Sequence, residues 1–275
     1  MKKRLLSALL TFCMVLTLLP VSAFAVTQPT NNSDHYATVS KTAERTGADT
    51  WDITMEVTAN TQIEPEPLEL VLVMDYSYSM QENVSGATGK DRSRMYVAGN
   101  AAKNLIRDLQ AANVNAKVSV VKFAEDAQTP QKLIKLTEAN VDSICNKIPA
   151  YKSAAYGMGT NMRSGLVEAG EQLKANSNAK QVIIMLSDGQ KRGGGDPISY
   201  ASTLKNTRGI EIYTVGFAAD VDTLAKIATD SAHYYTTSTV DGLTDVFTAI
   251  SASITAMVDD SMGEDRRCGH QRRGG

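Results

Sequence analysis

The chain has 275 residues, of which 43% are hydrophobic, and 28 lysines and arginines are balanced by 30 aspartates and glutamates. This length and apolar content can bury a sizeable core, so we expect one globular domain with additional segments. The formal net charge of −2 and the scattered basic residues provide no positive stripe for a phosphate backbone, which argues against nucleic-acid binding.

The N-terminal residues show the pattern of a secretory signal peptide. Three basic residues at positions 2–4 precede an apolar run over residues 5–21, and Ala23-Phe24-Ala25 supplies the small residues of a cleavage site. We therefore interpret residues 1–25 as a Sec signal peptide, which predicts a secreted or cell-surface protein associated with the cell wall. An uncleaved membrane anchor is the alternative, which Pro20 disfavours. Cleavage changes the formal net charge from −2 to −5, and no later stretch is long and apolar enough to insert into a membrane.

Cysteine is sparse in this sequence. Only Cys145 and Cys268 follow the expected cleavage point, which excludes a disulfide-stapled scaffold. Cys145 falls on the helical spacing of Val141, Ile144 and Ile148, so we interpret it as a small core residue. With no CxxC motif and three histidines, a zinc site is not expected.

Two short alternating runs precede the main body of the chain. After a polar stretch at 26–36, which we expect to be a flexible leader, the runs ATVSKTAER and TWDITMEVTA are separated by Thr46-Gly47-Ala48-Asp49. Alternation around such a turn predicts a β-strand pair within residues 37–66. Because two strands alone are marginally stable in water, we interpret the pair as part of an incomplete β-rich domain.

Apolar runs of strand length alternate with amphipathic segments from residue 68 onward. This alternation predicts an α/β domain over residues 67–258, with a doubly wound, mostly parallel sheet flanked by helices. In such sheets a functional site is expected beyond the carboxyl ends of the strands. The predicted strands are 68–75, 116–124, 132–136, 181–186, 210–217 and 233–237.

Four helices are predicted between and after these strands. Asp196 followed by Pro197 predicts the start of one helix, and Gly209 predicts its end. The other three are indicated by apolar residues at three- and four-residue spacing. Their apolar faces comprise Ala98, Ala102, Leu105 and Leu109; Met162, Leu166, Ala169 and Leu173; and Leu243, Val246, Phe247, Ile250, Ile254 and Met257.

Oxygen-bearing side chains gather where two predicted strands end. The strand 68–75 ends in Asp75 and continues into Ser77 and Ser79, and the strand 181–186 is followed by Asp188. A glycine-containing loop places Thr160 just before a helix. Two carboxylates and three hydroxyls, without nitrogen or sulfur ligands, suit a small hard cation such as Mg²⁺ (or Mn²⁺). The sequence therefore predicts a metal site at one edge of the sheet.

These residues resemble the metal-ion-dependent adhesion site of von Willebrand factor type A domains, and the similarity covers roughly residues 67 to 258. The resemblance implies that Ser77, Ser79 and Thr160 contact the metal directly, while Asp75 and Asp188 act through bound water. Neutral hydroxyls leave the charge of the ion incompletely compensated, so a carboxylate of a partner protein can complete its shell.

Two further features follow from this resemblance. Tyr78 stands where the family usually has a small residue, which would shape the access to the metal. The resemblance also implies that the helix at 243–257 can shift and couple the metal geometry to affinity.

The function that the resemblance implies is metal-dependent adhesion by an exported bacterial surface protein. The expected partner offers an acidic side chain and is a host matrix or surface protein, or a neighbouring pilus or envelope subunit. The alternative is a structural module of a pilus or envelope assembly, in which the metal only stabilises the loops. A metal-dependent hydrolase is the third interpretation.

No catalytic motif supports an enzyme. Phosphatases of the haloacid-dehalogenase type need a second aspartate where Ser77 stands. The sequence contains no nucleophile elbow and no P-loop, and no dinucleotide fingerprint follows the first strand. The glycines at 193–195 precede a helix start and are conceivable as a phosphate cradle, but we interpret them as a plain loop.

The last residues, 259–275, are polar and rich in arginine, without apolar periodicity. We expect a solvated tail, and a truncated or frame-shifted reading frame is the alternative. The strand pair favours truncation, because in the bacterial surface and pilus-tip proteins that this chain resembles the type A domain is often inserted into a β-rich stalk. Lys41 lies where some such stalks form an intramolecular isopeptide bond, but we interpret it as an exposed lysine.

Overall fold

The computed structural model describes residues 37–47, 50–59, 67–175, 177–189, 192–218 and 222–267. Its contacts divide the chain into two units, Met1–Glu64 and Pro65–Gly275. The predicted signal peptide, the leader and the last eight residues, including Cys268, lie outside the described residues.

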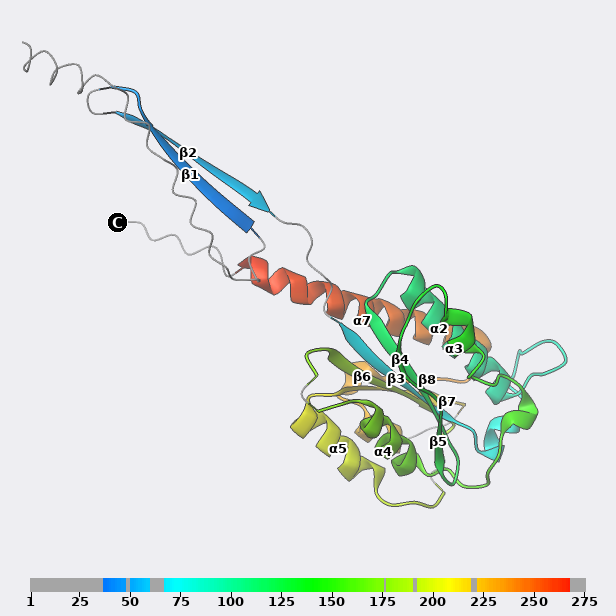
Figure 1. Ribbon diagram of the computed structural model, residues 1–275. Helices are drawn as coiled ribbons and strands as arrows, with labels where there is room; N and C mark the ends of the chain where they lie inside the picture. The colour runs from blue at the N-terminus through cyan, green and yellow to red at the C-terminus, as the bar shows by residue number, and fades with distance from the viewer. Residues whose placement is uncertain are drawn as a thin grey trace, which may run out of the picture. The chain divides into compact units, whose positions relative to one another are not determined.

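The first unit contains a β-hairpin, as the sequence predicted. Strands β1 (Ala37–Arg45) and β2 (Trp51–Ala59) pair antiparallel, with Ala37 opposite Ala59 and Arg45 opposite Trp51 (Figure 1). Trp51, Ile53 and Met55 alternate along β2 and are all more than half exposed. Because alternate residues of a strand share a face, the hairpin presents an apolar face to solvent.

Six strands form the sheet of the second unit, in the order β5-β4-β3-β6-β7-β8. Neighbouring strands are parallel except for β5, which runs antiparallel to β4. The predicted doubly wound, mostly parallel α/β fold is therefore confirmed. The strands are β3 (Leu68–Asp75), β4 (Ala116–Phe123), β5 (Ala127–Lys135), β6 (Lys180–Ser187), β7 (Glu211–Phe217) and β8 (Tyr234–Thr237).

Strand β5 begins five residues earlier than the predicted 132–136. Its first half contains Pro130, which lacks a donor for the strand ladder and so weakens the sequence signal for a strand. β5 is an edge strand, and Pro130 lies between Gln128 and Gln131, where the register with β4 shifts.

Helices cover both faces of the sheet (Figure 1). Strand β3 is buried throughout because its alternate residues enter two separate core layers. Leu70 and Leu72 pack on one face, and Val71 and Val73 pack on the other. The first face carries α2 (Arg94–Ala111), α3 (Val141–Cys145) and α7 (Val240–Arg267); the second carries α4 (Met162–Gln172), α5 (Pro197–Arg208) and α6 (Asp222–Ile227).

The helix termini follow the sequence signals in most places. Asp196 caps α5 by accepting a hydrogen bond from the Ile198 amide at 2.9 Å, and Gly209 ends the helix with a φ of 65°. The last helix differs, since α7 continues to Arg267 where a tail was expected from residue 259. This stretch has no apolar periodicity, and it contains three aspartates and Gly263, which are poor helix formers, so the sequence carried no signal for the continuation. Among the described helices, none is long and apolar enough to cross a membrane.

Candidate metal site

Asp75 lies at the carboxyl end of the central strand β3 and is fully buried. Its Oδ1 accepts a hydrogen bond from the Ser77 amide at 2.8 Å, and its Oδ2 accepts one from the hydroxyl of Ser187. Ser187 ends β6, which pairs with β3 in parallel. The carboxylate is thus held by its own turn and by the neighbouring strand.

Ser77 and Ser79 flank the start of a short 3₁₀ helix, η1 (Tyr78–Gln81). The tight turn brings their hydroxyl oxygens to 3.0 Å from each other. Ser77 is buried, whereas Tyr78 between them is 46% exposed. The two hydroxyls therefore lie together directly after Asp75, with the tyrosine at the surface.

Thr160 belongs to a loop that is bonded to both strand ends. Its amide donates to the Arg192 carbonyl at 2.9 Å, and Arg192 follows the end of β6. Three residues earlier, the Gly157 carbonyl accepts a hydrogen bond from the Tyr78 amide at 2.9 Å, and Gly157 pairs with Ser77. These backbone bonds carry the buried Thr160 to the edge of the sheet where β3 and β6 end.

Asp188 directly follows β6 and is almost fully buried. Its Oδ2 accepts a hydrogen bond from Nη1 of Arg94 at 3.0 Å. Its Oδ1 is buried and has no hydrogen-bond partner within the described part of the chain. An orphaned carboxylate oxygen is costly inside a protein, so this atom is suited to a ligand.

The two carboxylates interact electrostatically. Burial, and after it the negative charge of Asp188, raise the pKa of Asp75 to about 6. A divalent cation between such groups offsets both effects, because it favours the charged form of each. The buried charges, the free Oδ1 and the adjacent hydroxyls therefore fit a small oxygen-preferring cation.

The candidate metal site needs hydroxyl oxygens as well as carboxylate oxygens as ligands. The residues that the structure describes include no group of three or more His, Cys, Asp or Glu side chains able to hold a metal. Two residues that bond to the carboxylates of this site, Ser187 and Arg94, were not identified from the sequence. Ser187 was detectable as the polar end of a buried strand, but nothing local marked Arg94.

Cys145 and His233 lie outside this site and make packing contacts. Cys145 is buried, as predicted, and its Sγ lies 3.7 Å from the Lys103 carbonyl. His233 packs against Tyr213, with ring centroids 4.5 Å apart, and its Nδ1 lies 2.7 Å from Asp230. The burial of Cys145 agrees with its expected role as a small core residue.

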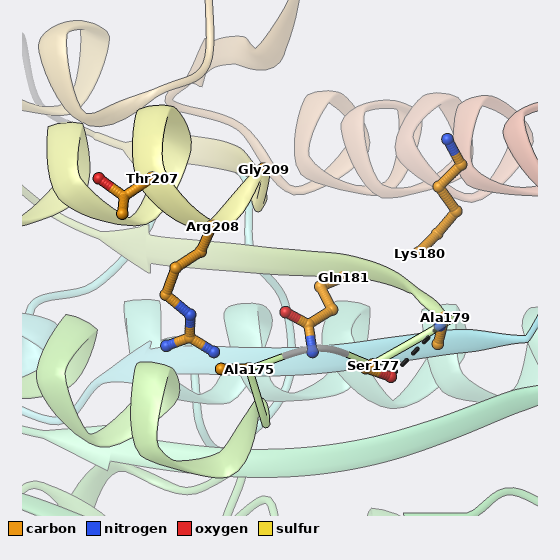
Figure 2. A pocket seen from close by; sticks show the side chains of 8 residues that line it. All are labelled: Ala175, Ser177, Ala179, Lys180, Gln181, Thr207, Arg208 and Gly209. Carbon is orange, nitrogen blue, oxygen red and sulfur yellow. Dashed lines mark hydrogen bonds between the residues drawn. The ribbon is translucent and has the colours of Figure 1, made fainter.

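A hollow of about 300 Å³ lies at the other end of the strands, beside the start of β6. Figure 2 shows the side chains of Arg208 and Gln181 at this hollow. Arg208 donates to the carbonyls of Gly170 and Leu173 at the end of α4, and Gln181 donates to Glu69 at 2.9 Å. Their polar groups stabilise the fold locally, so we assign this hollow no function.

The family model of the von Willebrand factor type A domain matches residues 69–249, in agreement with the resemblance drawn from the sequence. The pilus adhesin SpaC from Lactobacillus rhamnosus GG has a similar structure, with a TM-score of 0.58 and 19% identity over 83% of this chain. The chain covers 35% of SpaC.

Two further solved structures are similar to the chain. The von Willebrand factor domain of the type V pili tip protein Mfa5 from Porphyromonas gingivalis has a TM-score of 0.57 and 16% identity, over 77% of this chain and 98% of its own. The mussel byssus protein PTMP1, with a zinc-occupied MIDAS motif, has a TM-score of 0.53 and 19% identity, over 70% of this chain and 46% of its own. At these identities the likeness shows the fold.

Proposed function

The chain belongs to the von Willebrand factor type A family, and from this premise we propose that it is a divalent-metal-dependent protein-binding module of an exported surface protein. The observation that carries the proposal is the buried carboxylate of Asp188, with a free Oδ1 at the sheet edge where Asp75 ends β3. The residues that would hold Mg²⁺ or Mn²⁺ are Asp75, Ser77, Ser79, Thr160 and Asp188.

The chemistry of the donors favours recognition of an anion. A bound divalent ion supplies a positive charge that three neutral hydroxyls do not cancel, so it retains affinity for an outside carboxylate. The hydrogen bond from the Ser77 amide and the one from Ser187 hold Asp75 in a fixed orientation. A fixed orientation lowers the entropy cost of assembling the site.

Exposed apolar side chains near these residues support a protein partner. Tyr78 lies between the two serines, Met158 lies two residues before Thr160, and Tyr96 lies in the first turn of α2. Met158 is 66% exposed, and the two tyrosines are also exposed. Tyrosine and methionine are enriched in protein interfaces, whereas a site for a lone small anion needs no such rim.

The similar structures support adhesion as the purpose of binding. SpaC is described as a pilus adhesin, and the Mfa5 domain belongs to a pili tip protein. Export of the present chain rests on the signal-peptide pattern of residues 1–25. We infer no enzymatic activity, because Ser187, whose hydroxyl donates to Asp75, is fully buried and out of reach of a substrate.

A chelator experiment tests the proposal. The purified chain is passed over immobilised collagen and fibronectin in Mg²⁺, in EDTA and after Mg²⁺ is restored. We expect binding that disappears in EDTA and in Thr160→Ala or Asp75→Ala, with circular dichroism unchanged. Thr160→Ser, which keeps the hydroxyl, is the matched control and should bind. Binding that persists in EDTA would reject the metal-bridged mode.

The second candidate is a structural module in which the metal only stabilises the loops. The buried Oδ1 of Asp188 favours it, because a metal that satisfied this unpartnered atom would stabilise the fold without any partner protein. Mg²⁺ that raises the melting temperature without any partner binding would support this role, since a ligand of the native state stabilises it by mass action.

A further inference from the structure

Arg94 places a largely buried positive charge at the candidate metal site. Its side chain is only 16% exposed. Nη1 lies 3.0 Å from Oδ2 of Asp188, and Nη2 lies 2.7 Å from Oε2 of Glu82. The guanidinium therefore bridges a buried carboxylate of the site and a second carboxylate from the loop that follows η1.

The pair between Arg94 and Asp188 is incomplete. Arginine and a carboxylate can form two parallel hydrogen bonds, in which two guanidinium nitrogens donate to both carboxylate oxygens. Here Nε of Arg94 and Oδ1 of Asp188 are both buried without a partner among the described residues. The guanidinium thus neutralises Asp188 but leaves one of its oxygens available to another cation.

Glu82 gives Arg94 an anchor that is independent of Asp188. The Glu82 side chain is 63% exposed, and its backbone carbonyl also accepts a hydrogen bond from the Arg94 amide at 2.8 Å. Ser93 caps α2 directly before Arg94 and fixes the start of the helix. The guanidinium therefore keeps a partner when Asp188 binds something else.

We propose that Arg94 is an intramolecular competitor of the divalent metal at Asp188. In the metal-free protein the guanidinium compensates the buried carboxylate and stabilises the fold. In the metal-bound protein the two cations share that carboxylate and repel each other. Arg94 thereby weakens metal binding and sets the metal concentration at which the site fills. This inference rests on the proposed function, because it needs a metal at the same residues.

The test measures Mg²⁺ affinity by titration calorimetry and melting temperature in EDTA. We expect Arg94→Met to bind Mg²⁺ roughly tenfold more tightly, since a neighbouring cation changes a carboxylate's affinity for a proton by one pKa unit or more. The same variant should melt at a lower temperature in EDTA, because Asp188 is then uncompensated. Arg94→Gln, which removes the charge but keeps a hydrogen-bond donor, repeats the measurement if the methionine variant does not fold.

Arg107 on the same helix provides a matched control. Its Nη2 lies 3.2 Å from Oδ1 of Asp142 in an exposed pair. Arg107→Met removes the same charge from α2, and we expect its Mg²⁺ affinity to stay within about twofold of the original chain, because exposed charges are screened.

Glu82→Gln tests the anchor. Without Glu82 the guanidinium is held by Asp188 alone, so we expect Mg²⁺ to bind several-fold more weakly. This effect should be lost in the double variant with Arg94→Gln, because a double-mutant cycle isolates the part that passes through Arg94.

The outcomes separate the inference from the proposed function. Absence of Mg²⁺ binding by the unaltered chain would overturn both. Mg²⁺ binding that is equal or weaker in the neutral Arg94 variants would overturn the competitor role alone, and would assign Arg94 to positioning Asp188. Tighter binding in those variants, with Arg107→Met unchanged, supports competition.

Discussion

The hydroxyl of Ser187 donates a hydrogen bond to Oδ2 of Asp75, joining two strand ends that lie 112 residues apart along the chain. The same Ser187 oxygen accepts a hydrogen bond from the Gly189 amide at 3.0 Å. Gly189 directly follows Asp188, so one buried hydroxyl holds both the first carboxylate and the turn that carries the second. The geometry of the candidate metal site thus depends on a residue that would not itself contact the metal.

Ser187→Ala should therefore destabilise the protein. It leaves a buried carboxylate oxygen without its donor, and we expect the free energy of unfolding to fall by about 1 to 3 kcal/mol. Urea denaturation in EDTA measures this loss without any contribution from metal. Ser199→Ala is the matched control, because Ser199 makes a similar hydroxyl-to-carboxylate bond to Asp196 at an exposed position. An equal loss in both variants would contradict the special role of Ser187.

The exposed side chains of Tyr78 and Met158, close in sequence to the proposed metal ligands, yield a prediction about partner binding. Tyr78→Ala and Met158→Ala should each weaken binding to the immobilised partner by roughly fivefold or more, the effect of losing about 1 kcal/mol at an interface. Their Mg²⁺ affinity should not change, since neither side chain is among the proposed donors. Surface plasmon resonance and calorimetry measure the two quantities separately.

Ile134→Ala is the control for Tyr78→Ala and Met158→Ala. Ile134 is also an exposed apolar residue of the α/β unit, but it pairs with Val118 near the start of β4, at the opposite edge of the sheet. We expect partner binding to be unchanged in this variant. Similar losses from Ile134→Ala and Tyr78→Ala would indicate that the partner is not held at the metal edge.

Gly165 is required where α4 packs on the sheet. A Cβ at this position would lie 3.0 Å from Cδ1 of Phe123 and 3.0 Å from Cγ1 of Val73, both buried. Alanine normally stabilises a helix by about 1 kcal/mol relative to glycine. Here we expect Gly165→Ala to lower the melting temperature instead, because overpacking a core costs about 1 to 3 kcal/mol. Glu171→Ala, at an exposed position of α4, should leave the melting temperature nearly unchanged.

The sequence predicted the six strands and the helices α2, α4, α5 and α7 of the α/β unit, because each carries a local signal, whereas the short helix α6 was not predicted. β3 is a continuous apolar run that enters two core layers, and α5 begins at Asp196-Pro197 and ends at Gly209. β5 was predicted only in part, because Pro130 obscures its first half. The end of α7 was missed, because residues 259–267 have no apolar periodicity and include aspartates and a glycine, which disfavour helix.

The candidate site was also predictable only in part. Asp75 and Asp188 follow buried strands, and the rule that parallel strands end at one edge brings them together. The pairing of Arg94 with Asp188 joins residues 94 positions apart and depends on how α2 packs on the sheet. No spacing along the chain indicates such a contact, so only the structure identifies Arg94 and Glu82.

Glu69 is a buried carboxylate near the amino end of β3, at the opposite end of the strands from the candidate metal site. It lies on β3, directly across from Lys117 on β4 and Gln181 on β6. Its Oε1 lies 3.1 Å from Nζ of Lys117, and its Oε2 accepts a hydrogen bond from Gln181 at 2.9 Å. Burial alone would raise the pKa of the Glu69 carboxyl, but the hydrogen bonds from Gln181 and Lys117 outweigh it and lower the pKa below the usual value.

This lowered pKa predicts how stability depends on pH. A carboxyl with a lower pKa in the folded state contributes stability above its unfolded pKa, and the contribution is lost as pH falls through the folded value. Glu69→Gln should thus be less stable than the original chain at pH 7, by about 1 to 2 kcal/mol. The difference should shrink as the pH falls below about 4.5, which melting curves between pH 3 and pH 7 in EDTA would measure. A difference that stays constant across this range would show that Glu69 acts through packing rather than through its charge.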